Sequence, residues 1–330
     1  MVGPNGAGKT NLLESLHLGT QGFSPRTRSD AQLVRFGQEA ARVSLRGERA
    51  GAPIELEVTL KPREAKRATV NGAQLRAAEQ LRAEVATLVF TPDRLVVVKG
   101  APAARRAYFD RALGRLAPAK AGLPAEYGAA VGQRNAALRR IVAGVSSREA
   151  LAPWNERVAD LGSQLVTSRH EIADLLGPPF AERAAELGLE GAAIRYVGEP
   201  LRVADLEARL ERDLDRGQTG IGPHLDDVEL LAGERDLRTF GSQGEQRLTV
   251  LALLLAEAAL IAERRGTPPL LLLDDVLSEL DPERRRILAT RIRSFGQALV
   301  TTTSSSALPL DADQLVEVAA GADGSAAVAA

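Results

Sequence analysis

The sequence predicts an α/β protein with a parallel central sheet and a nucleotide-binding P-loop, on the basis of two stretches. Four consecutive leucines, Leu270 to Leu273, are followed by Asp274 and Asp275. An uninterrupted apolar run is typical of a strand covered on both faces in a parallel sheet, and ligands bind such sheets at the carboxyl ends of the strands. Residues 3–10 have the P-loop spacing G-x-x-x-x-G-K-[ST]. An ordinary acidic turn would explain the leucine stretch alone, but the two stretches together favour a nucleotide site.

The residue types of the P-loop suit phosphate and metal binding. Its glycines let backbone N–H groups surround the phosphates, Lys9 can reach the β and γ phosphates, and the Thr10 hydroxyl can bind Mg²⁺. Residues 11–18 predict a helix whose N-terminus faces the phosphates. Paired carboxylates suit a divalent metal, with one binding Mg²⁺ and the other orienting a water molecule. The predicted cofactors are therefore ATP and Mg²⁺, with ATP bound by Gly3, Pro4, Asn5, Gly6, Ala7, Gly8, Lys9 and Thr10.

The composition excludes several other classes of protein. With 330 residues, the chain is long enough for about two domains. It contains no cysteine, which excludes disulfides and thiolate metal sites and fits a reducing, cytoplasmic location. The three histidines lie far apart, and the longest apolar run, residues 248–256, is well short of the roughly 20 residues that span a membrane. Because the net charge is -1, any nucleic-acid surface must be a local patch.

Residues 43–90 predict an antiparallel β layer beside the nucleotide-binding sheet. Apolar and polar residues alternate from Ile54 to Leu60, which is the period of a sheet with one solvated face. Residues 43–45, 69–70 and 86–90 predict further strands, and a tight turn is expected at Asn71 and Gly72.

Residues 94–148 form the strongest charge asymmetry of the chain, with eleven basic and two acidic residues. Such a block is typical of a surface that binds the phosphate backbone of DNA. Aromatic residues are few here, so stacking on single-stranded DNA is less well supported than duplex binding. Arginines on the solvated faces of helices are the alternative. The candidate DNA-binding residues are Arg105, Arg106, Arg111, Arg134, Arg139 and Arg140.

The next hundred residues predict helices and a hairpin. A helix with one apolar face is expected over residues 154–176, with the pair Pro178 and Pro179 as a break, and a shorter helix over 201–214. Residues 228–237 predict a β-hairpin. The heptad pattern is not sustained, so no coiled-coil arm is expected.

Ser242 and Gly244 open an apolar helix, residues 248–261, shortly before the leucine strand. A serine and a glycine at a helix start leave a hydroxyl and backbone N–H groups for an anion. A plain capping box between Ser242 and Glu245 is the alternative. Because this stretch precedes an acidic strand, we favour the interpretation that it is the signature motif of an ABC-type ATPase, the second element that contacts phosphate.

These elements predict an ABC-type P-loop ATPase head, with a β-rich lobe and a helical lobe inserted between the P-loop and the signature. Residues 1–93 would begin the ATPase lobe and 94–239 would form the basic helical lobe. Residues 240–320 would complete the ATPase with a helix over 283–294 and a strand over 298–303, whose polar end would lie near the γ-phosphate. Residues 321–330 predict a disordered tail.

The order of these motifs resembles the RecF family, relatives of the SMC-type ATPase heads. The aspartate pair followed by Val-Leu-Ser-Glu-Leu-Asp and the box Gly222-Pro223-His224 are particular to that family. The resemblance covers nearly the whole chain, through residues 3–14, 26–27, 33–37, 98–100, 105–106, 109–110, 133–135, 154, 222–224, 226–227, 242–247, 274–281 and 300–303.

The resemblance implies roles for individual residues. Lys9 and Thr10 would bind phosphate and Mg²⁺, Asp274 would hold the metal, and Asp275 would position the attacking water. Ser242 and Gly244 would contact ATP bound to a second subunit, and Asp281 would lie in a loop at that dimer interface. Leu225 stands where the family usually has arginine, which puts any contact assigned to that position in doubt. Glu245 replaces the more usual glutamine.

RecF-like proteins bind duplex DNA beside single-stranded gaps and act with RecO and RecR to load RecA. The resemblance thus implies a weak, DNA-stimulated ATPase that dimerises on ATP and serves DNA repair, replication, recombination and the SOS response. Its turnover rate, its preferred DNA structure and its RecR contact surface do not follow from the sequence.

Three other interpretations remain open. A transporter ATPase subunit places its signature roughly 100 residues after the P-loop, whereas here more than 200 residues intervene. An SMC head carries coiled-coil arms, whereas the heptad pattern of such arms is missing from this sequence. A nucleotide-gated DNA-binding module that does not hydrolyse ATP would be distinguished by the absence of phosphate release.

Only Met1 and Val2 precede the P-loop, which normally follows a buried strand of about five or six residues. We therefore expect a strand encoded upstream of this sequence. We also expect the 330-residue chain, made alone, to be insoluble or unable to hold ATP.

Overall fold

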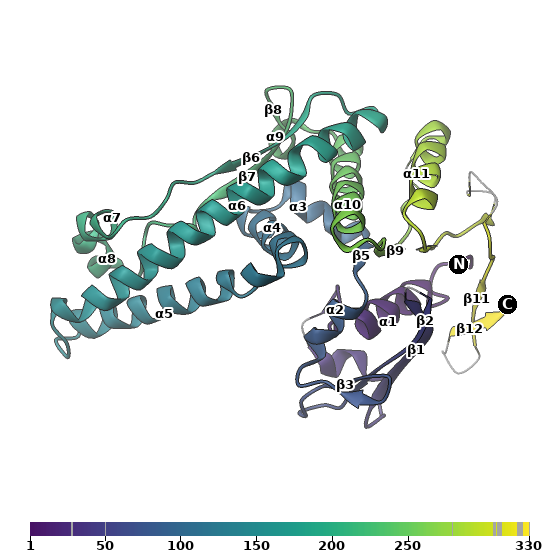
Figure 1. The fold of residues 1–330 in the computed structure, drawn as a ribbon, viewed down its shortest axis with the longest axis horizontal. Helices are drawn as coiled ribbons and strands as arrows, with labels where there is room; N and C mark the ends of the chain where they lie inside the picture. Colours follow the sequence, from purple (N-terminus) through teal and green to yellow (C-terminus); the bar gives the residue numbers. More distant parts are fainter. Residues whose placement is uncertain are drawn as a thin grey trace. The chain divides into compact units, whose positions relative to one another are not determined.

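The computed structural model describes residues 1–27, 29–49, 51–278, 280–305, 308, 312–321 and 326–329. The chain divides into two compact units, Met1–Arg94 with Ala258–Ala330, and Leu95–Glu257. Figure 1 shows the elements of each unit. The first boundary lies beside the predicted one at residue 93. The predicted segment 240–320 is instead divided between the units, because the continuous helix α10 (Gln243–Arg265) runs through the second boundary.

The first unit contains a parallel sheet with strand order β10-β9-β5, formed by Ala298–Val300, Leu270–Leu273 and Thr87–Phe90. The leucine strand β9 is central, and Leu271, Leu272 and Leu273 are fully buried. The helix α1 (Lys9–Gln21) packs on this sheet through Leu13, which contacts Val89 and Leu272. The prediction of a buried parallel strand is confirmed.

Residues 87–90 were expected in the antiparallel layer, and this prediction is wrong. β5 pairs in parallel with β9, from Thr87 opposite Leu270 to Phe90 opposite Leu273. All four residues of β5 are buried. A strand buried on both faces belongs to a sheet covered on both sides, and its sequence lacks the alternation of a half-solvated strand.

A separate antiparallel sheet has the order β1-β2-β3-β4. Its strands are Ala41–Arg49, Ala52–Leu60, Arg67–Val70 and Ala73–Gln74, and the helix α2 (Leu81–Glu84) follows. Leu56, Val58 and Leu60 of β2 are buried in a cluster with Leu18 of α1. Asn71 and Gly72 both have positive φ, 49° and 80°, as the predicted tight turn requires. The alternation in the sequence therefore predicted this layer correctly.

Residues 1–3 lie between the continuation of β10 and the strand β11 (Glu317–Ala320). The N–H of Thr302 donates to the Met1 carbonyl at 3.0 Å, and the N–H of Val318 donates to that of Val2 at 2.8 Å. β11 pairs with β12 (Ala326–Ala329), within the segment predicted to be disordered. A ladder of backbone hydrogen bonds thus includes part of that segment. Residues 322–325 and 330 lie outside the described residues.

The second unit is mainly helical. α5 lies alongside the long helix α6, and Figure 1 shows the two running next to each other. The helices are α3 (Val96–Lys99), α4 (Pro102–Leu116), α5 (Leu123–Val142), α6 (Ala152–Glu186), α7 (Val203–Ala208), α8 (Leu210–Arg216), α9 (Leu237–Phe240) and the first part of α10. No described helix is long and apolar enough to cross a membrane.

Two helix predictions for this unit need correction. α6 continues through Pro178 and Pro179. The next turns bury Phe180 and Ala184 completely, so packing outweighs the lost backbone hydrogen bonds. The helix predicted over 201–214 is two helices, α7 and α8, which meet at Arg209.

A small antiparallel sheet completes the second unit, with the order β6-β7-β8. Its strands are Ala192–Val197, Asp227–Ala232 and Arg235–Asp236. β7 and β8 form the predicted hairpin, whereas β6 was not predicted. In the first unit, α11 (Pro282–Ser294) forms as predicted.

Candidate nucleotide site

The P-loop has the backbone geometry of a phosphate-binding turn. Gly6 and Gly8 have φ of 81° and 96°, backbone angles that residues with a Cβ rarely adopt. The Lys9 ammonium donates to the carbonyls of Gly3 at 2.7 Å and Pro4 at 2.9 Å. Lys9 thus bends back over the loop, which concentrates positive charge where α1 begins. Backbone N–H groups, the helix N-terminus and an ammonium together suit a polyphosphate.

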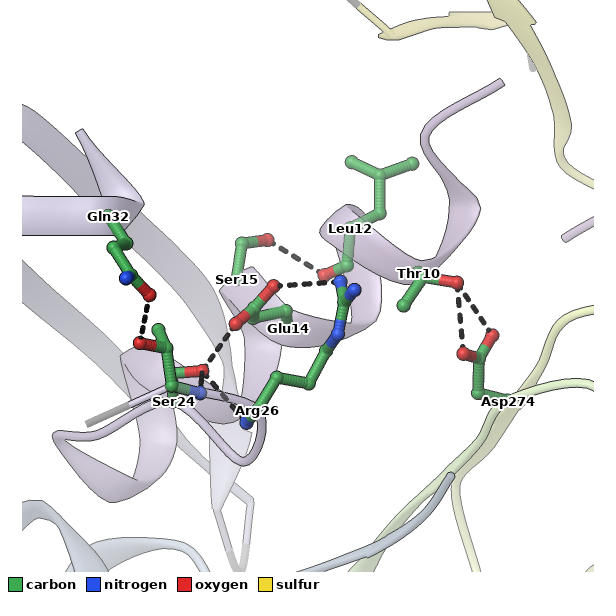
Figure 2. Close-up of polar contacts among 9 residues, drawn as sticks. Thr10, Leu12, Glu14, Ser15, Ser24, Arg26, Gln32 and Asp274 are labelled. Carbon is green, nitrogen blue, oxygen red and sulfur yellow. Dashed lines mark hydrogen bonds and ion pairs between the residues drawn. The ribbon is translucent and has the colours of Figure 1, made fainter. Parts of the chain in front are cut away.

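Thr10 and Asp274 form the second part of the site. The Thr10 hydroxyl donates to the Asp274 carboxylate, with Oγ1 at 2.9 Å from Oδ2 and 3.1 Å from Oδ1, as Figure 2 shows. Thr10 belongs to the first turn of α1 and Asp274 follows β9, so the fold brings together residues 264 positions apart. A hydroxyl and a carboxylate are hard oxygen ligands of the kind Mg²⁺ takes.

The donor set fits a nucleotide-bound metal better than a metal held by protein alone. Among the described residues there is no group of three or more acidic or histidine side chains that could hold a metal ion. Mg²⁺ in nucleotide sites is bound through one or two protein oxygens, with phosphate oxygens and water completing the shell. Thr10 and Asp274 supply such a partial set.

Asp275 has an unusual backbone conformation, with φ of 48°. A non-glycine residue in this region is strained and must be held by its surroundings. The Asp275 N–H donates to Oγ1 of Thr301 at 2.9 Å, and the Ser278 hydroxyl lies 3.1 Å from the Asp275 Oδ2. The backbone therefore turns sharply after the leucine strand and directs the two carboxylates differently.

A hydrogen-bond cluster fixes the loop that follows α1. The Ser24 hydroxyl donates to Glu14 of α1 and accepts from the backbone N–H groups of Arg26 and Thr27. Arg26 also pairs with Glu14, with 3.4 Å between nitrogen and oxygen (Figure 2). The positive charge of Arg26 is thus partly neutralised by a carboxylate of α1.

The signature residues begin α10 in the second unit. The Ser242 N–H donates to Glu245 Oε2 at 2.8 Å, and the Glu245 N–H donates to Ser242 Oγ at 3.2 Å. The capping box considered for this sequence is therefore present. The hydrogen bond from the Ser242 backbone, followed by that from Arg235, holds the pKa of Glu245 below its usual range. Gly244 is exposed, and a Cβ added there would meet only Ser242 Oγ, at 3.9 Å.

Asp281 caps the helix α11. Its carboxylate accepts from the Arg284 N–H at 2.9 Å, and this backbone bond is the main cause of the lowered pKa of Asp281. The residue is exposed.

Two of the six candidate DNA-binding arginines are buried, which corrects their assignment. Arg105 is 2% exposed and pairs with both carboxylate oxygens of Asp227 at 2.7 Å. Arg134 is fully buried, and its Nη1 lies 2.7 Å from Asp213. Neither guanidinium can reach a DNA phosphate, because each already neutralises an acidic side chain inside the unit.

The other four candidates differ in exposure. Arg106 is half-buried and donates to the backbone carbonyl of Asp226. Arg111 on α4 and Arg139 and Arg140 at the end of α5 are exposed, and no salt bridge with a described residue neutralises them. These three remain candidates for contacting DNA.

The Gly-Pro-His segment is held by side chains from several helices, which sequence reasoning did not anticipate. Arg169 of α6 donates to the Pro223 carbonyl at 2.6 Å and pairs with Asp110 of α4. The His224 Nδ1 lies 2.8 Å from the Tyr127 hydroxyl of α5. Burial is the main cause of the lowered pKa of His224, so the ring favours its neutral form. This segment therefore connects α5 with α6, and Arg169 in turn links α6 to α4.

A parallel sheet with a P-loop before α1, paired aspartates after β9 and a helical unit inserted between them define an ABC-type ATPase head of the kind found in RecF and SMC proteins. Residues 1–326 match the family described as "RecF/RecN/SMC N terminal domain". The sequence is 36% identical over 317 residues to the "DNA replication and repair protein RecF" of Heliobacterium modesticaldum, covering 92% of this chain and 85% of that protein. The chain belongs to the RecF family.

Other similar proteins agree. RecF of Anaeromyxobacter dehalogenans is 38% identical over 343 residues, covering 98% of this chain and 88% of the relative. A solved structure titled "Structure of the recombination mediator protein RecF-ATPrS in RecFOR pathway" superposes with a TM-score of 0.87 at 27% identity, covering 100% of this chain and 91% of that one. An SMC head domain from Pyrococcus furiosus superposes with a TM-score of 0.57 at 18% identity. The match covers 99% of this chain and 88% of the SMC chain. The SMC likeness shows the fold alone.

Proposed function

We propose that this chain is an ATP-dependent DNA-binding protein of recombinational repair and replication restart, with ATP hydrolysis as a slow switch. The contact between Thr10 and Asp274 beside the Lys9 loop is the main support, because it brings together, from distant parts of the chain, groups that suit phosphate and Mg²⁺. The relatives named for DNA replication and repair, and the RecF structure titled with an ATP analogue, support the same role.

ATP would be bound by the P-loop, and Mg²⁺ by Thr10 and Asp274. When bound, the metal would neutralise charge on the phosphates. Asp275 would orient the attacking water and accept its proton. Because an aspartate is one methylene shorter than the glutamate of many related ATPases, the water would be held loosely, which favours slow turnover.

ATP would also join two copies of the chain. Gly244 is exposed, and Phe240, two residues before Ser242, has 67% of its surface exposed. An exposed aromatic beside exposed polar groups is typical of a surface that a partner covers. In the dimer, Ser242 and Gly244 would contact ATP of the second copy, and Asp281 would lie at the interface.

The proposed DNA partner is a duplex beside a single-stranded gap. Arg111, Arg139 and Arg140 would contact phosphates, which position a protein on DNA without reading its sequence. RecR is the proposed protein partner, with RecO and RecA acting in the same pathway. The neighbour's title supports this by placing RecF in the RecFOR pathway.

The test of the proposed function compares gapped with blunt duplex DNA, each with and without ATP and Mg²⁺. We expect tighter binding to gapped DNA only when ATP is present, measured by fluorescence anisotropy. Equal binding to both DNAs regardless of nucleotide would contradict the proposal.

Replacing Arg111, Arg139 and Arg140 together by alanine should weaken binding of all DNA sequences by about 10- to 100-fold and leave ATP binding unchanged. Each lost phosphate contact should reduce the salt slope of log K by about 0.9. Anisotropy titrations at several salt concentrations measure both effects.

The matched control removes three exposed arginines that pair with carboxylates of the same unit, Arg157, Arg195 and Arg202. This triple variant has the same net charge as the test variant, so equal losses in both would show that overall charge, rather than a defined surface, governs binding. A loss confined to one DNA sequence would also exclude backbone recognition.

A further inference from the structure

Thr301, directly after β10, makes hydrogen bonds to both aspartates of the nucleotide site. It is fully buried, and its own N–H donates to the Leu273 carbonyl at 2.9 Å, which extends the pairing of β10 with β9. Its hydroxyl donates to Asp274 Oδ1 at 2.6 Å and accepts from the Asp275 N–H at 2.9 Å. One hydroxyl at the end of β10 thus connects both residues.

These two bonds have different consequences. The bond to Asp274 fixes one carboxylate oxygen from the side of the sheet, while Thr10 approaches the same carboxylate from α1. The bond from Asp275 satisfies a backbone N–H in a residue whose φ of 48° is unfavourable without support. Partners of metal-binding carboxylates hold them in the productive orientation.

We propose that Thr301 is a positioning residue of the ATPase site, whose hydroxyl orients the Asp274 carboxylate for Mg²⁺ and holds the turn that places Asp275. This inference rests on the proposed function, because it assigns Thr301 a role in the same site. Valine has nearly the same shape as threonine but can make neither bond, whereas serine keeps the hydroxyl.

The neighbouring Thr302 provides a matched control. It is also buried, at 4% exposure, and its hydroxyl donates to the Ser304 carbonyl at 3.2 Å. Thr302→Val therefore removes a buried hydroxyl from the same strand without touching either aspartate.

The experiment measures binding of a fluorescent ATP analogue as Mg²⁺ is titrated, together with kcat and KM for hydrolysis, in the full chain. Thr301→Val and Thr301→Ala should each raise the Mg²⁺ concentration for half-saturation and lower kcat by about 10- to 100-fold, as losses of a metal ligand's partner do. Binding of the analogue in EDTA and KM at saturating Mg²⁺ should change by less than about 3-fold. Thr301→Ser should restore both properties, and Thr302→Val should keep the parental Mg²⁺ midpoint, because its hydroxyl bonds neither aspartate.

A purely structural role for Thr301 would have a different signature. Lower stability would reduce the amplitude of binding in proportion to the unfolded fraction but leave the Mg²⁺ midpoint unchanged. Parental Mg²⁺ midpoints in both hydroxyl-free variants, or equal shifts in Thr302→Val, would overturn the inference and leave the proposed function intact. Failure of the analogue to bind this chain, both as it stands and with the residues encoded upstream of Met1 added, would instead reject the proposed function.

Discussion

Asp275→Asn should bind ATP with nearly parental affinity and hydrolyse it about 100- to 10,000-fold more slowly, the range expected for loss of a general base. Asparagine keeps the size of the side chain and the backbone N–H that bonds Thr301, but its amide cannot accept a proton from water. Single-turnover phosphate release and a parallel measurement of ATP affinity separate chemistry from binding. Hydrolysis at the parental rate would reject the role of Asp275.

The same variant allows the proposed dimer to be tested, because ATP that is not hydrolysed should keep the two copies of the chain associated. Light scattering should show a dimer of Asp275→Asn with ATP and a monomer without it. Adding Gly244→Arg should restore the monomer. The monomer has room for a side chain at this position, whereas in the dimer the arginine would clash with the facing subunit. An ATP-bound dimer that tolerates Gly244→Arg would place the interface elsewhere.

The sequence was sufficient to predict that the P-loop and the aspartate pair come together, because both occur in short patterns with a defined local structure. The P-loop and the leucine strand each specify a backbone geometry, and a parallel sheet brings their ends together. Thr10 and Asp274, which were both expected to bind the metal, lie in contact. The bonds of Thr301 did not, because three threonines follow one another and only the strand register selects the one that faces the aspartates.

The arginines show a limit of composition-based reasoning. Arg105 and Arg106 are adjacent and chemically identical, yet one is buried and the other is partly exposed. Their difference depends on Asp227, which is 122 positions from Arg105 and lies in another element. A local count of charges includes both residues equally, so it overestimates the surface available to DNA.

Arg134→Met should destabilise the chain by about 3–5 kcal/mol, the cost of leaving a buried charge unpaired. Arg134 is fully buried, and it donates to Asp213, to Thr219 at 2.8 Å and to Asn155 at 2.8 Å. Methionine fills similar space but leaves Asp213, which is 1% exposed, without its cation. Urea denaturation followed by circular dichroism measures the loss.

The pairing with Asp213 accounts for this loss only if removing both charges costs less than removing one. Arg134→Met combined with Asp213→Leu should therefore recover most of the stability, since an apolar pair of similar volume can replace a buried ion pair. Arg139→Ala on the exposed end of the same helix should change the free energy of unfolding by less than about 0.5 kcal/mol. If the double variant were as unstable as Arg134→Met, the lost bonds to Asn155 and Thr219, rather than the unpaired carboxylate, would explain the effect.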